Sequence, residues 1–480
     1  DRKIVISLFE SGAIQVLVAS RETCWALDSV HAHTVVIMGA ERYNGREHRY
    51  TDYCIPDILQ MMGRASRPGI DSKSLCVLMC MANKREFYTK FLQDPLPLES
   101  RLDAQLHDPL NSEIVSKTIT GKQDAVDYLT WTLMYRRLVQ NPNYYGLQGT
   151  SHQHLSDYLS ELVESTINDL AGAKCVTLDE DEIGVTPTNL GIIAAFYQIR
   201  YLTVEMFALS LNETTKLRGV LDIVSAADEF EALPIRHREA NILTKIARRC
   251  PVELPGNASR DTNSDWWNSP RVRTHVLLQA HFSRLTLPAD LAADQAWVLA
   301  KVLPLLQAMV DVASSMELLP AALAAMELSQ MSVQAVWEGR DSLVKQVPHL
   351  GTAERLKLCE SMQVDSVFGV MDMEDEDRAK LLHGLEPKQI ADVAAYVNRY
   401  PNIEVEFEVA NEVHANGIVV LTLSLDREWD EDEEGDIPGP VIAPFFPYSR
   451  GEGWWVVIAD GKTLVNVRRI SVGKELQRQI

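Results

Sequence analysis

The spacing of apolar residues changes along these 480 residues, and each change limits the kind of domain that the segment can form. In residues 1–100, short apolar runs at 14–18 (IQVLV), 34–38 (TVVIM) and 74–80 (SLCVLMC) alternate with a helical segment at 57–62 (DILQMM). Apolar strands that alternate with helices are typical of a buried parallel sheet. This part therefore predicts an α/β unit, of which only about half is present.

Residues 101–187 predict a small helical domain that ends in a hairpin. Apolar residues at 155–170 keep helical spacing, and Gly172 is a suitable C-terminal stop. The segments 175–178 (CVTL) and 184–186 (GVT) flank an acidic turn and predict two strands. Helices followed by a two-stranded wing form a winged helix, which serves either as a scaffold or as a nucleic-acid reader. We favour the scaffold.

Residues 188–338 predict a helical bundle. Thr188 can cap a helix that runs through Tyr201. Two long amphipathic stretches follow at 272–287 and 294–316.

Residues 339–400 predict a helix-loop-helix module, whose last helix begins at Pro387. Residues 401–480 change to alternating apolar and polar side chains, which predict a β-sandwich of immunoglobulin or fibronectin type. An acidic loop at 430–436 is expected to be a solvated turn. The expected strands lie at 403–409, 419–425, 454–458 and 463–470.

Charge and cysteine content restrict the partners and the compartment. The formal net charge is −21, whereas nucleic-acid binders normally carry a basic surface, so the composition favours protein partners. Seven scattered cysteines argue for a reducing compartment, and Cys76 and Cys80 are expected in a core, not at a metal site. No run approaches the ~20 apolar residues of a membrane span. Neither an initiator Met nor a signal peptide precedes Asp1, so we expect a fragment of a longer chain.

The segment 60–68 (QMMGRASRP) carries the most informative chemistry. Arg64 and Arg67 lie three residues apart, a spacing that places two guanidinium groups on one helical face. Such a pair can clamp phosphate through charge-assisted hydrogen bonds, although a surface ion-pair cluster would show the same pattern.

This segment resembles motif VI of superfamily 2 helicases, from which it departs mainly at Ser66. The resemblance implies nucleotide binding by Gln60, Gly63, Arg64 and Arg67, across a cleft between two RecA-like domains. Arg67 would be the arginine finger that stabilises charge on the transferring phosphoryl group.

Residues 15–28 resemble motif V of the same helicases, in which small hydroxyl residues touch the RNA backbone. Ser20 and Thr23 are the candidate RNA contacts here. Arg21 and Glu22 interrupt the hydroxyl-rich stretch, and Ala26 replaces a glycine, so we expect little RNA binding by this segment.

The resemblance extends to the Ski-two-like subgroup over nearly the whole chain, including its Sec-sixty-three-type C-terminal unit. In that subgroup a long helix scans single-stranded nucleic acid, and 294–316 aligns with it, but Lys301 is its only basic residue. We therefore expect a bundle helix without RNA contact. The resemblance is carried by 94–100 (DPLPLES), 122–132 (KQDAVDYLTWT), 141–145 (NPNYY), 320–331 (PAALAAMELSQM) and 452–458 (EGWWVVI).

More narrowly, the chain resembles the second, C-terminal cassette of tandem-cassette spliceosomal RNA helicases. This implies a nuclear role in pre-mRNA splicing, as a regulatory and protein-docking module; an active helicase cassette is the alternative. The implied partners are an active sister cassette of the same polypeptide, proteins of the U-five particle, and small nuclear RNA through the parent protein.

The sequence contains neither a GxxxxGK[ST] phosphate loop nor an acid box that would hold a metal ion. Two arginines alone cannot position and cleave a phosphoanhydride. We therefore expect no catalytic residue and no metal site in this chain alone. ATP and Mg²⁺ would bind only together with the missing first RecA-like domain.

Overall fold

The computed structural model describes residues 2–21, 24, 30–45, 47, 49–93, 98–236, 239–254, 265–409, 421–427 and 440–471. The chain divides into two compact units. Unit 1 comprises Asp1–Ser100 together with Pro234–Glu239, and unit 2 comprises Arg101–Leu233 together with Ala240–Ile480. The domain bounds expected from the sequence stay a prediction.

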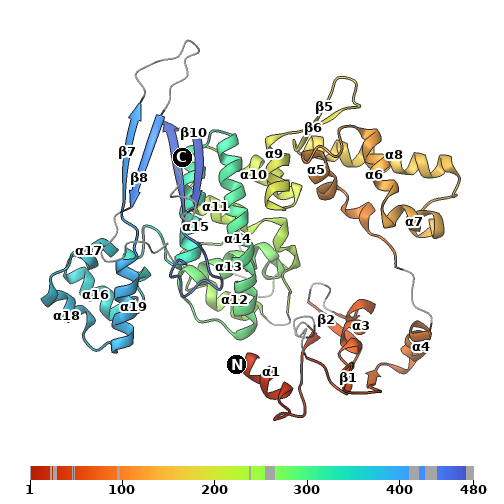
Figure 1. Cartoon of the computed structure of the whole chain (residues 1–480), viewed down its shortest axis with the longest axis horizontal. Coiled ribbons are helices and arrows are strands. Elements are labelled where there is room, and N and C mark those ends of the chain that lie inside the picture. The colour runs from red at the N-terminus through yellow and green to blue at the C-terminus, as the bar shows by residue number, and fades with distance from the viewer. Residues whose placement is uncertain are drawn as a thin grey trace. The chain divides into compact units, whose positions relative to one another are not determined.

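Unit 1, of which residues 1–100 are drawn in red to orange in Figure 1, is built around a parallel strand pair, β1 (Thr34–Met38) and β4 (Leu75–Met79). In this pair Thr34 lies opposite Leu75 and Met38 opposite Met79. The two strands at 34–38 and 74–80 and a parallel sheet were expected from the sequence and are confirmed; the RecA-like assignment stays a prediction. The remaining elements are α1 (Arg2–Glu10), the antiparallel pair β2 (Glu41–Asn44) and β3 (Arg49–Asp52), α3 (Ile55–Gly63), η1 (Ala82–Lys84) and α4 (Arg85–Gln93).

A small apolar core holds α3 against the strands. Ile58 of α3 is buried with Ile37, Ala40 and Tyr88, and Cys76 and Cys80 pack around this cluster. Burial raises the pKa of the Cys76 thiol. Both cysteines therefore contact the core, as expected, but each is only partly buried.

The strand expected at 14–18 is wrong. These residues are irregular, and Val16 and Val18 are 76% and 90% exposed. An apolar run becomes a buried strand only when a neighbouring strand accepts its hydrogen bonds. In the described part of the chain, β1 and β4 pair with each other, and no strand pairs with 14–18.

Unit 2 begins with the winged helix, which is confirmed. A wing of two antiparallel strands follows three shorter helices and the long helix α8, which ends at Gly172 as expected. The elements are η2 (Leu102–Gln105), α5 (His107–Val115), α6 (Lys122–Thr130), α7 (Leu133–Gln140), η3 (Pro142–Tyr145), α8 (His152–Gly172), β5 (Val176–Leu178) and β6 (Val185–Pro187).

The helix that follows is shorter than expected. Thr188 does cap it, because its Oγ1 accepts the backbone N–H of Gly191 at 3.4 Å. However, α9 (Asn189–Tyr197) ends at Gln198, whose φ of 53° is left-handed, and α10 (Tyr201–Ser210) starts anew. The prediction of one helix through Tyr201 is wrong because a left-handed residue cannot continue an α-helix.

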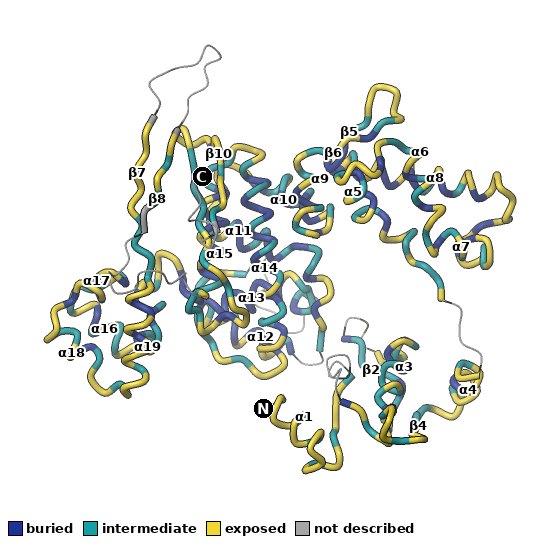
Figure 2. Tube along the Cα trace, in the orientation of Figure 1, coloured by how far each residue is buried: buried dark blue, intermediate teal, exposed yellow. Residues whose placement is uncertain are grey.

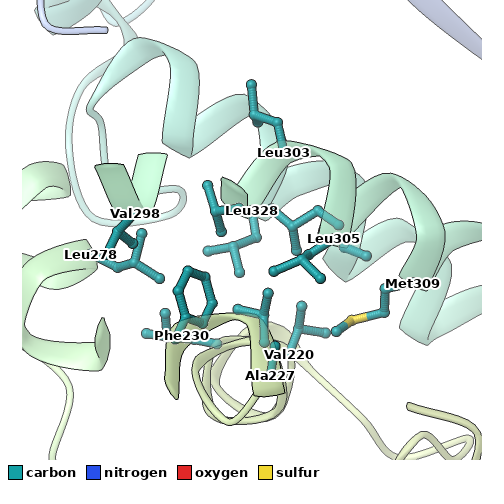
Figure 3. Packing of buried hydrophobic residues seen from close by; sticks show 14 of the residues in the cluster. Val220, Ala227, Phe230, Leu278, Val298, Leu303, Leu305, Met309 and Leu328 are labelled. Carbon is teal, nitrogen blue, oxygen red and sulfur yellow. The ribbon is translucent and has the colours of Figure 1, made fainter. Parts of the chain in front are cut away.

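The helical bundle encloses the largest hydrophobic core among the described residues. Phe230 lies among Val220, Leu278 and Leu305 in this core (Figure 3). The bundle contains α11 (Leu217–Ser225), η4 (Asp228–Ala232), α12 (Ala240–Ala247), η6 (Asp265–Asn268), α13 (Pro270–Phe282), α14 (Ala289–Ser315) and α15 (Leu319–Gln334).

Helix α14 corrects the expectation that no segment is apolar enough for a membrane span. It begins at Ala289 instead of 294 and is long and apolar enough to cross a membrane. The most apolar stretch of this helix is nevertheless largely buried inside unit 2 (Figure 2). There α14 packs along α15, α13 and α9. We therefore assign it as a core helix.

The C-terminal part consists of short helices and two antiparallel strand pairs, β7–β8 and β9–β10. The last helix begins at Pro387 as expected, and the acidic loop at 430–436 lies outside the described residues. The β-sandwich stays a prediction, because the described strands pair only two by two. The elements are η7 (Leu343–Gln346), α16 (Ala353–Ser361), α17 (Val367–Met371), α18 (Asp375–Leu382), α19 (Pro387–Asn398), β7 (Ile403–Val409), β8 (Leu421–Arg427), β9 (Gly453–Asp460) and β10 (Thr463–Ser471).

Candidate nucleotide-binding site

Helix α3 carries the first residues of the arginine segment. Pro56 lies in its first turn, where its missing N–H costs nothing, and Asp57 adds a negative charge that suits a helix N-terminus. Gln60 is half-buried, and the helix ends at Gly63. The buried Ile58 fixes the orientation of the helix.

The loop after α3 is attached to the starts of β1 and β4. The backbone N–H of Ala32 donates to the Arg64 carbonyl at 2.9 Å. The N–H of Leu75 donates to the His33 carbonyl at 3.0 Å. Backbone hydrogen bonds therefore place the loop that carries Arg64 and Arg67 beside His33.

Arg67 and Asp71 of this loop lie beside His33, which precedes β1. Arg67 Nε and Nη2 lie 2.6 and 2.5 Å from Asp71 Oδ2, and His33 Nδ1 lies 3.1 Å from the same oxygen. Burial disfavours the charged carboxylate, but the hydrogen bonds from Arg67 and His33 outweigh it and hold the pKa of Asp71 below its usual value. The arrangement presents an oriented, partly exposed guanidinium group.

The segment that resembles motif V is attached to the same helix. Arg21 Nε lies 2.7 Å from Oδ2 of the buried Asp57, which also accepts a hydrogen bond from Cys54 Sγ at 3.0 Å. The Arg21 guanidinium lies 5.9 Å from the Tyr53 ring centroid. Arg21 is thus bound to α3 in unit 1.

The structure brings some of the expected site residues together and leaves others apart. Gln60, Gly63, Arg64 and Arg67 share one helix and its following loop in unit 1. Ser20 is exposed in the same unit, and Thr23 lies outside the described residues. Lys301 belongs to unit 2, where its ammonium lies 4.8 Å from the Trp297 ring centroid.

Three residues of this arrangement were missed from the sequence: His33, Asp57 and Asp71. The spacing of Arg67 and Asp71, an i,i+4 pair, was a usable signal. Asp57 and Arg21 are 36 residues apart, and no local pattern connects them.

Helix α14 carries a second polar cluster, on its contact with β10. Arg469 Nη2 lies 2.7 Å from Asp311 Oδ1 and 2.9 Å from the Gln307 carbonyl oxygen. Tyr197 Oη donates to Asp311 Oδ2 at 2.8 Å, and Arg469 Nη1 donates to Tyr197 Oη. A strand hairpin therefore covers this stretch of the helix.

A winged helix joined to a helical bundle with a docked hairpin defines the class of module, and comparison with known families agrees. Residues 187–479 match the Sec63 Brl domain, and residues 99–180 match a winged helix-turn-helix domain. The chain belongs to the Sec63 Brl domain family.

Individual relatives confirm the expected resemblance to spliceosomal RNA helicases. The chain is 52% identical to the U5 small nuclear ribonucleoprotein 200 kDa helicase of Homo sapiens, over 98% of the chain and 21% of that protein. It is 45% identical to an activating signal cointegrator 1 complex subunit 3-like protein of Dictyostelium discoideum, over 99% and 21%. The pre-mRNA-splicing factor brr2 of Schizosaccharomyces pombe is also 45% identical, over 99% and 21%. The chain thus spans about a fifth of the length of these relatives.

Proposed function

We propose that this chain is the rear part of a helicase cassette in a nuclear spliceosomal RNA helicase. In this proposal the cassette binds ATP together with a preceding RecA-like domain, hydrolyses it weakly or not at all, and acts as a regulatory and protein-docking module. The names of the human and fission yeast relatives support the splicing role. The alternative is an active ATP-dependent RNA helicase cassette.

The proposed nucleotide binding rests on one observation: Arg67 contacts Asp71, and Asp71 in turn contacts His33. A guanidinium group held in this way loses little conformational entropy when it binds a phosphate. Gln60 lies in the helix that leads into the same loop.

The RNA-binding part of an active cassette is less well supported. Arg21 interrupts the hydroxyl-rich stretch and is bound to Asp57 within the unit. Lys301 stacks on Trp297, and β10 covers α14 around Gln307 and Asp311. These contacts favour a module that binds a nucleotide without moving along RNA.

The charge supports protein partners. A net charge of −21 repels RNA phosphates and attracts basic protein surfaces. We propose an active sister cassette of the same polypeptide and proteins of the U-five particle as the partners. Small nuclear RNA would be engaged by the parent protein.

The test uses the full-length parent protein with Arg67→Ala, and Arg85→Ala as the control at an exposed arginine of α4. Fluorescent ATP binding and unwinding of a paired RNA are measured for each variant. We expect Arg67→Ala to weaken one class of ATP sites by about tenfold or more and to leave the unwinding rate unchanged. Loss of unwinding would favour the active-cassette alternative, and unchanged ATP binding would contradict nucleotide binding at this loop.

A further inference from the structure

We propose that Asp71 is a positioning residue, which orients Arg67 toward the terminal phosphate of a bound ATP. This inference rests on the proposed nucleotide binding. Asp71 contacts one edge of the Arg67 guanidinium group, and a second edge is left for a ligand.

A guanidinium group has five N–H donors in one plane. Asp71 Oδ2 accepts from Nε and from Nη2, which form one side edge of the Arg67 group. The end edge, formed by Nη1 and the second hydrogen of Nη2, is the pair that can bind a phosphate with two parallel hydrogen bonds. The carboxylate and a phosphate can therefore bind the same arginine at different edges.

His33 fixes the carboxylate in turn. Its Nδ1 lies 3.1 Å from Asp71 Oδ2, and its backbone carbonyl accepts the N–H of Leu75 at 3.0 Å. The orientation of Arg67 is thus connected to the starts of both β1 and β4. A side chain that is held through two successive contacts loses less conformational entropy when it forms a new hydrogen bond.

A second interpretation predicts the opposite effect of removing Asp71 on nucleotide affinity. If Asp71 occupied the hydrogens that a phosphate needs, it would be a competitor, and its removal would tighten nucleotide binding. The contact at the Nε edge favours positioning over competition.

The experiment measures the affinities of the full-length protein for fluorescent ATP and ADP analogues with Mg²⁺. The variants are Asp71→Asn and His33→Ala, with Glu86→Gln as the control, since Glu86 pairs with Lys90 on the exposed face of α4. We expect Asp71→Asn to weaken ATP binding about 3- to 10-fold, with ADP binding unchanged. His33→Ala should produce a smaller loss that is also selective for ATP. The control should change neither affinity.

Three results would overturn the proposal: tighter ATP binding by Asp71→Asn, an equal loss of ATP and ADP binding, or no change. If Asp71→Asn does not fold, His33→Ala decides alone, and an unchanged preference for ATP over ADP overturns the positioning role. Arg67→Ala separates the two hypotheses. If it weakens ATP binding while Asp71→Asn does not, only the positioning role fails; if it has no effect, the proposed nucleotide binding fails.

Discussion

Arg469 of β10 and Asp311 of α14 are 158 residues apart in the chain and form a two-point ion pair, with Nη2–Oδ1 and Nη1–Oδ2 distances of 2.7 and 3.1 Å. The same guanidinium donates to the Gln307 carbonyl and to Tyr197 Oη. Burial and the hydrogen bond to Asp311 raise the pKa of the Tyr197 hydroxyl, so Tyr197 stays a neutral donor at physiological pH. The contact fastens the C-terminal hairpin to the bundle.

Arg469→Met should release this hairpin. We expect a loss of about 1–2 kcal/mol, because the pair is partly exposed but makes several charge-assisted hydrogen bonds. Hydrogen exchange should become faster in β9 and β10 and stay unchanged in α8 of the winged helix. Arg468→Met is the matched control, because the neighbouring residue of a strand points to the other face. Equal acceleration in both variants would argue against a specific role of Arg469.

Breaking the buried ion pair of the bundle should cost more stability. Arg273 of α13 is 1% exposed, and its Nη2 lies 3.1 Å from Oδ2 of the buried Asp294 of α14. Asp294→Ala would leave a buried guanidinium without its carboxylate, which typically costs about 3–5 kcal/mol. Urea unfolding of the whole chain measures this loss. Exposed Asp290→Ala, in the first turn of the same helix, should cost less than about 1 kcal/mol; similar costs for the two variants would contradict the assignment.

The attachment of Arg21 to α3 can be tested by a double-mutant cycle. Arg21→Ala removes the ion-pair partner of the buried Asp57 and should destabilise unit 1 by about 1–3 kcal/mol. Asp57→Asn removes the charge that Arg21 neutralises, so the double variant should be more stable than the sum of the two losses predicts. The measurement is hydrogen exchange in α3. Additive losses would show that the two side chains do not interact.

Local patterns predicted much of this fold. The wing at 175–186, the start of α19 at Pro387 and the alternation of β7 follow from side-chain period and turn chemistry, which act within a few residues. The run at 14–18 is as apolar as β1, but no described strand lies beside it. Composition alone does not indicate whether a partner strand is present. The helix end at Gln198 also escaped prediction, because that position carries no glycine or asparagine.

Only part of the candidate site could be predicted, because local patterns connect only residues that are close in the sequence. Arg64 and Arg67 were visible because they lie in one short segment that resembles a known motif. The contacts that orient them come from other elements: Ala32 and His33 precede β1, and Asp71 precedes β4. Parallel pairing of β1 with β4 brings these residues together. Patterns within short stretches of sequence cannot predict which strands pair.

Buried His281 should make the stability of the chain depend on pH. Burial lowers its pKa to about 4, although its ring Nε2 donates to the Ser332 carbonyl at 2.8 Å, and the positive charge of Arg284 also disfavours protonation. Because the folded-state pKa lies below the value of about 6.5 in an unfolded chain, the unfolded state binds the extra proton. The stabilising contribution is therefore complete above pH of about 6.5 and is lost as the pH falls toward about 4. At about 1.4 kcal/mol per pH unit, the loss amounts to about 3 kcal/mol.

The check is urea unfolding of the whole chain between pH 4 and pH 8, beside His281→Gln. A glutamine amide can still donate to the Ser332 carbonyl but does not titrate, so the variant should lose less stability than the native chain as the pH falls over this range. His152→Gln, at an exposed position in the first turn of α8, is the control and should keep the native pH dependence. Parallel pH profiles for His281→Gln and the native chain would show that another group causes the acid sensitivity.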